Sequence, residues 1–108
     1  MNNLDFSNHS DIACVRNAVN SARNAARREA REENATTYDT VKFHELEALA
    51  HEMDAKVLET KYTVLSKDAS PVEVARQAEC EAGIALARAY RDEASVTYEA
   101  TRQVWLAE

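Results

Sequence analysis

Apolar residues recur at intervals of three and four along most of this chain, which is the spacing of one face of an α-helix. The chain contains three such series of apolar residues: Ile12, Val15, Val19, Ala22 and Ala26; Phe43, Leu46, Ala50, Met53, Val57 and Val64; and Val74, Ala75, Ala78, Ala82, Ala85, Ala89 and Val96. The pattern predicts three helices, at about residues 10–34, 40–65 and 71–106.

The breaks between these helices differ in strength. Ser70 stands where a helix cap is expected, Pro71 takes the first helical position and Glu73 the third, so the last helix is predicted to begin at Pro71. Thr and Asn residues between positions 34 and 40 favour a turn. Residues 28–39 also resemble residues 88–99, however, and a true duplication would make 34–40 helical. The alternative is then a two-armed long helical hairpin hinged at Ser70.

Composition supports an all-α fold, because the 108 residues include one glycine and one proline and are rich in alanine, the best helix former. The length suits one helical domain over residues 1–108. We therefore predict an elongated antiparallel three-helix bundle. Because alanine buries little surface, its core should be thin, and we expect it to be completed by dimerisation.

Arginine and lysine are segregated along the chain. All nine arginines lie in the first and third predicted helices, and all four lysines lie in the middle segment. The two outer helices are therefore alike in being rich in Ala and Arg. We expect them to pack their alanine faces together, since small side chains allow close helix axes.

The first helix carries the main candidate for a binding surface. At about 100° per residue, one stripe of this helix holds the following residues: Arg16, Asn20, Arg23, Arg27 and Arg31. Such a stripe can bind an acidic protein surface or follow nucleic-acid phosphates, or it can pair with acids of a neighbouring helix. The net charge of −6 disfavours nucleic acid as the partner.

The third helix is apolar over a wide arc and is longer than the others, about 55 Å against about 38 Å at the helical rise per residue. We expect its last turns to project beyond the other helices. Aromatic and aliphatic residues there would need cover from a second copy, so the predicted dimer interface consists of Tyr90, Tyr98, Val104, Trp105 and Leu106.

The middle helix presents possible metal ligands at a spacing of three, four and three: His44, Glu47, His51 and Asp54. The Glu-x-x-His pairs of di-iron bundles are absent, and so is the His-Glu-x-x-His motif, because position 48 is alanine. We interpret this stripe as side-chain pairing along a solvated helix. We expect neither a metal nor another cofactor.

Nothing in the sequence favours catalysis. A single glycine excludes a glycine-rich phosphate loop. Neither a secretory signal nor an apolar membrane span is present, so we expect a cytoplasmic protein with Cys14 and Cys80 as free thiols.

The function expected from these features is that of a non-catalytic protein-binding module. The small size, the acidity and the lack of a cofactor motif suit a stand-alone regulator or inhibitor, of the type that phages and mobile elements direct against host machinery. The alternatives are a structural or scaffolding subunit, or an RNA- or DNA-binding protein that uses the arginine stripe of the first helix.

Overall fold

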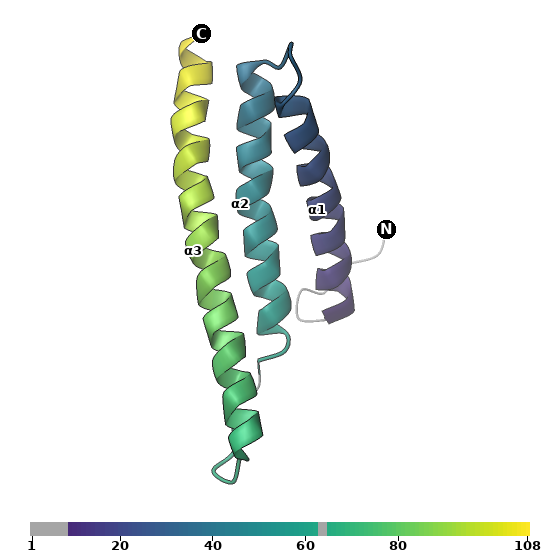
Figure 1. The fold of residues 1–108 in the computed structure, drawn as a ribbon, viewed down its shortest axis with the longest axis vertical. Helices are drawn as coiled ribbons and strands as arrows, with labels where there is room; N and C mark the ends of the chain where they lie inside the picture. The colour runs from purple at the N-terminus through teal and green to yellow at the C-terminus, as the bar shows by residue number, and fades with distance from the viewer. Residues whose placement is uncertain (1–8, 63–64) are drawn as a thin grey trace.

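A computed structural model describes residues 9–62 and 65–108 of the chain. These residues form three helices and no strand: α1 (His9–Ala30), α2 (Thr37–Glu59) and α3 (Pro71–Ala107). The predicted elongated bundle of three antiparallel helices is confirmed (Figure 1). Its principal dimensions are 59 × 33 × 21 Å, because the helices lie side by side in one layer with α2 in the middle.

The outer helices do not pack on each other as the sequence suggested. Within the described ranges α2 contacts both α1 and α3, and α1 and α3 make no contact. The expectation that their alanine faces meet is therefore wrong. Both helices instead direct their inner faces at α2, which separates them along its whole length (Figure 1).

The connection between α1 and α2 is a turn, and the continuous-helix alternative is wrong. Thr36 caps α2: its hydroxyl accepts a hydrogen bond from the Asp39 backbone N–H at 3.3 Å, and the Asp39 carboxylate accepts one from the Thr36 N–H at 2.9 Å. This reciprocal pair satisfies two backbone donors and fixes the start of α2. Consequently α1 ends at Ala30, four residues before the predicted end at residue 34.

The cap of α3 is confirmed as predicted. The Ser70 hydroxyl accepts a hydrogen bond from the Glu73 backbone N–H at 3.2 Å, and Pro71 occupies the first turn. The end of α2 was predicted too late, because α2 stops at Glu59, where the Thr60 hydroxyl donates to the Val57 carbonyl at 2.6 Å. Val64, which belonged to the predicted second series, lies outside the described residues.

The overhang of α3 lies at the end opposite to the one predicted. The Thr37 hydroxyl donates to the Glu108 carboxylate, so the last residue of the chain is level with the first turn of α2. At the other end, the Tyr62 hydroxyl donates to Glu81 at 3.0 Å. The first turns of α3 therefore extend beyond α2, as the lower part of Figure 1 shows.

The core is thin, in line with the alanine content. Ile12 of α1 packs against Met53 and Val57 of α2, with Val15 and Val19 at the margin. Ile12 is the largest side chain that is fully buried among the described residues. Two alanines of α2, Ala50 and Ala55, have no exposed surface, and such small residues allow neighbouring helices to approach closely.

Gly83 of α3 faces Leu58 of α2, and an added Cβ would lie 2.9 Å from Leu58 Cδ1. That methyl is the end of a flexible side chain, and it borders a hollow of about 460 Å³ into which it can rotate. We therefore expect Gly83→Ala to raise the free energy of unfolding by about 0.5–1 kcal/mol through helix propensity.

Urea unfolding followed by circular dichroism measures this change. Ala85→Gly, at an exposed site one half-turn further along α3, is the control and should lower stability by a similar amount. A loss of stability in Gly83→Ala would mean that the close contact with Leu58 outweighs the gain in propensity.

Candidate protein-binding surfaces

The arginine stripe of α1 faces α2 over part of its length. Arg23 and Arg27 lie 3.8 and 3.6 Å from the two carboxylate oxygens of Glu47 on α2. Arg27 also stands over the ring of Phe43, at 5.6 Å from its centroid. These two arginines are thus already paired with an acid within the chain, which leaves them less available to a partner.

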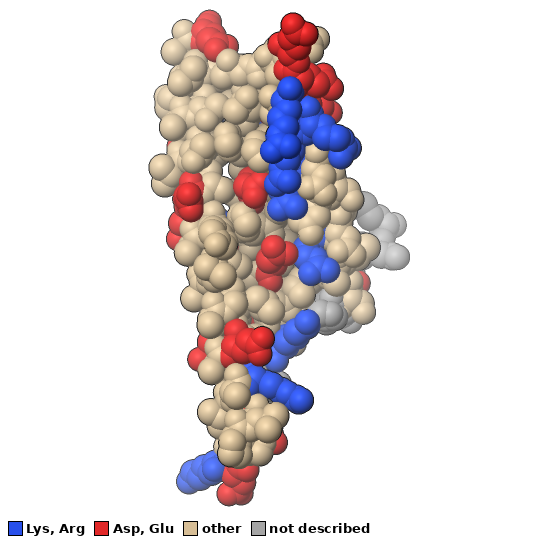
Figure 2. Space-filling view, in the orientation of Figure 1, with Lys and Arg blue, Asp and Glu red and all other residues tan. Residues whose placement is uncertain are grey.

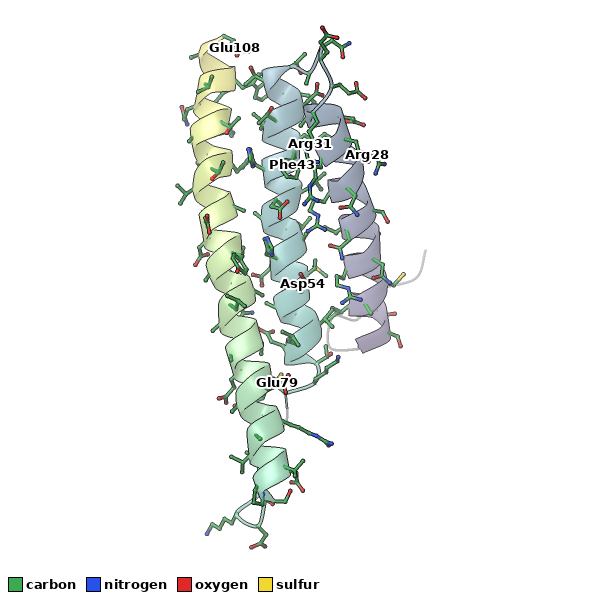
Figure 3. The ribbon with its side chains drawn as sticks, viewed as in Figure 1. Arg28, Arg31, Phe43, Asp54, Glu79 and Glu108 are labelled. Carbon is green, nitrogen blue, oxygen red and sulfur yellow. The ribbon has the colours of Figure 1, made fainter. Side chains whose placement is uncertain are left out.

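The remaining members of the stripe have different surroundings. Arg16 donates to the neighbouring Asn17 side chain at 3.2 and 3.3 Å. Asn20 is half-buried. Arg31 has no ion pair in the part of the chain that the structure describes, and Figure 3 shows it close to Phe43, whereas Arg28 points away from α2. Arg31 is therefore the one exposed arginine of the stripe, and Arg28, which is outside the stripe, is exposed as well.

A hollow of about 450 Å³ opens between α1 and α3 above the middle helix. Its floor includes Phe43 and Glu47, one wall carries Arg31, and the other carries Tyr90 and Glu93. Figure 2 shows this face of the molecule, with Lys and Arg side chains over α1 at the upper right and further ones at the lower end.

The stripe of possible metal ligands on α2 is used for pairing within the chain. The Glu47 carboxylate is 3.1 Å from Nε2 of His51 and also pairs with arginines, while the ring of His44 packs against Phe43 at 5.1 Å. Asp54 lies further along α2 (Figure 3). No group of three or more potential ligands in residues 9–62 and 65–108 is arranged to hold a metal ion.

On the other side of α2, arginines of α3 bind two further glutamates. Arg88 contacts Glu52 and Glu59, and Arg91 contacts Glu52. A hydrogen bond to Glu52 and a weaker contribution from a hydrogen bond to Asp92 raise the pKa of Arg91 above its ordinary value. The sequence analysis did not single out these glutamates, although the restriction of arginine to the outer helices was the signal that could have found them.

A long uncovered apolar surface lies on the side of α3 that faces away from α2. We call it the outer face of α3. Its large side chains are at least about half exposed, with Val96 at 71%, Val104 at 57% and Leu86 at 55%. Small apolar residues fill the space between them, and all of these are exposed: Ala75, Ala78, Ala82, Ala85 and Ala89.

The residues of the predicted dimer interface are divided among several surroundings. Trp105 packs against Tyr38 at 5.3 Å, and Tyr90 lies 5.4 Å from the ring of His51, so both have neighbours on α2. Tyr98 is half-buried, whereas Val104 and Leu106 are exposed. The predicted cluster is thus not one continuous surface, and Val104 is the member that belongs to the outer face of α3.

Comparisons with known proteins give no relative: no family model, no curated protein and no solved structure matches the chain. Across the described residues, no helix combines the length and the apolar character needed to cross a membrane. The functional argument therefore depends on the surfaces alone.

The ion-pair cluster around Glu47 makes a direct prediction about stability. Its side chain is only 20% exposed and touches Arg23, Arg27 and His51. Because removal of its charge leaves partly buried cations without an acid, Glu47→Gln should lower the free energy of unfolding by about 1–2 kcal/mol. Glu45→Gln, at an exposed position with no ion pair found in the described residues, is the matched control. Equal urea midpoints for the two variants would contradict the prediction.

Proposed function

We propose that this chain is a non-catalytic protein-binding module that uses the outer face of α3. The supporting observation is the length of apolar surface that α3 leaves uncovered, from Val74, 49% exposed, to Val104, 57% exposed. Exposed apolar surface of this extent on one side of a helix is typical of a protein interaction site. A partner helix could lie along it, because the alanines between the larger residues leave room for a close approach.

The arginine stripe is a weaker candidate for the main binding surface. Arg23 and Arg27 already pair with Glu47, and their transfer to an acidic partner would leave that half-buried carboxylate without its cations. The same pairing argues against a nucleic-acid site along α1. Arg31 and Arg28 remain open and can contribute at the margin of a partner that covers the end of α1.

We further propose that the protein acts by occupying a surface of its partner, as a small regulator or inhibitor does. The small size of the fold and its single layer suit this role, since most side chains lie at or near a surface. A scaffolding subunit is the second candidate, because a 37-residue helix such as α3 can hold two partners along its length.

The proposal is tested by placing charge in the middle of the outer face. Leu86→Glu combined with Val96→Glu changes two exposed side chains, 55% and 71% exposed, so the helices should still form. Asn24→Glu combined with Arg28→Glu, on the exposed side of α1, is the control pair. Circular dichroism should show wild-type helicity in both double variants.

The measurement is quantitative capture from a native lysate together with light scattering of the purified protein. We expect wild type to retain a protein partner, or a second copy, that the α3 variant loses and the α1 variant keeps. The proposal is contradicted if the α3 variant retains the same proteins in the same amounts as wild type. It is equally contradicted if wild type captures nothing specific and is monomeric.

A further inference from the structure

The outer face of α3 has acidic residues on both of its flanks. At about 100° per residue, Glu79 falls on one flank, and Glu81, Asp92 and Glu99 fall on the opposite one. Glu93 falls within the apolar strip itself, on the side of the hollow above α2. All five residues are exposed. Acids therefore lie along both edges of the apolar strip, and one lies within it.

The last three arginines of α3 do not neutralise these acids fully. Arg88 and Arg91 point towards α2, where Glu52 and Glu59 already provide two acidic partners. Arg91 also contacts Asp92, whose side chain is 69% exposed. Arg102 lies 3.8 Å from Glu99 at the far end of the helix.

Three of the acids have no ion pair within the described residues: Glu79, Glu81 and Glu93. Glu79 shares the hollow beside Leu58 with Lys61 and Arg76, and Glu81 accepts a hydrogen bond from the Tyr62 hydroxyl. Figure 3 shows Glu79 on the lower part of α3, near the end of α2. In Figure 2 the upper part of α3 shows red and tan side chains, whereas the blue side chains in the upper half of the molecule lie over α1.

The size of the strip indicates that apolar contact alone gives a weak complex. From Val74 to Val104 the strip is about 45 Å long, and with a helix width of about 10 Å it offers on the order of 450 Å². That area is below the roughly 800 Å² that each partner contributes to a stable interface. The charge of the acids on this face must then contribute both to the affinity for a partner and to the choice of that partner.

We propose that the occupant of this face is a cationic amphipathic helix of a partner protein. Its apolar side would lie on the strip, and its Lys or Arg side chains would meet Glu79 at one edge, Glu81 and Asp92 at the other, and Glu93 between the two edges. This inference depends on the proposed function, and it adds the chemistry of the partner. A second copy of α3 would bring acid against acid, in a chain whose net charge is already −6.

Two synthetic helical peptides test the inference directly. Both carry the same strip of Leu and Ala at positions i, i+3, i+4 and i+7, and their flanking residues are Lys in one and Glu in the other. Titration of the fluorescent peptides with the intact protein at ~50 mM salt should give at least about tenfold tighter binding of the Lys peptide. This preference should fall at least about threefold at ~500 mM salt, because screening shortens the range of the attraction.

A triple substitution separates the role of the acids from that of the apolar side chains. Glu79→Gln, Glu81→Gln and Glu93→Gln together keep the side-chain size and should weaken binding of the Lys peptide at least about fivefold. The control removes three exposed acids elsewhere: Glu32→Gln, Glu33→Gln and Glu45→Gln. The control protein has the same net charge as the triple variant, so a purely long-range effect would appear equally in both.

Several results would overturn the inference. Any one of three results would show that these acids do not select a cationic helix. These are equal affinity of the two peptides, equal weakening by the two triple variants, and no binding of the Lys peptide at ~200 µM protein. If one of these occurs while lysate capture still depends on Leu86 and Val96, the inference fails and the proposed function stands. A wild-type dimer that Leu86→Glu with Val96→Glu dissociates would identify a second copy as the occupant and would also overturn it.

Discussion

The contacts between the arginines of the outer helices and the glutamates of α2 are the feature on which the arrangement depends. Glu47 forms ion pairs with Arg23 and Arg27 of α1, and Glu52 forms ion pairs with Arg88 and Arg91 of α3. Each partly exposed ion pair contributes about 1 kcal/mol or less, so these pairs do not dominate the stability. Their effect is on specificity, since they require α2 to lie between the two arginine-bearing helices.

Apolar packing then fixes how closely the helices lie. Fully buried Ala50 and Ala55 allow neighbours to approach α2, and Ile12 fills the space beside Met53 and Val57. Because the two outer helices share only α2, neither covers the far side of the other. For α1 that far side is polar, whereas for α3 it carries Leu86 and Val96. The uncovered apolar face is thus a direct consequence of the single layer.

Helices and caps could be predicted from the sequence because they depend on residues close together in the chain. Ser70, Pro71 and Glu73 fix the start of α3 by local hydrogen bonding, and the structure confirms it. The choice of neighbour could not be predicted in the same way. Periodicity shows which side of a helix is apolar, but the wide apolar arc of α3 fits either α1 or α2 as its neighbour.

The overhang of α3 and the position of Trp105 show the same limit. The length of α3 could be read from the sequence, but which of its ends projects depends on where the Tyr62–Glu81 and Thr37–Glu108 contacts set the register. Trp105 consequently packs on Tyr38 instead of standing uncovered. Of the predicted site residues, Arg23 and Arg27 proved to be paired within the chain, and the acids beside the outer face of α3 were not singled out.

The distance between α1 and α3 tests this account most directly. Spin labels at Ser21→Cys and Ala89→Cys, with Cys14 and Cys80 replaced by serine, would be placed on the exposed sides of the two helices. Two helix spacings of about 8–10 Å separate their axes when α2 lies between them, and one spacing separates them in a closed bundle. We expect a pulsed electron resonance distance above about 30 Å, and a distribution centred near about 20 Å would contradict the single layer and the open face of α3.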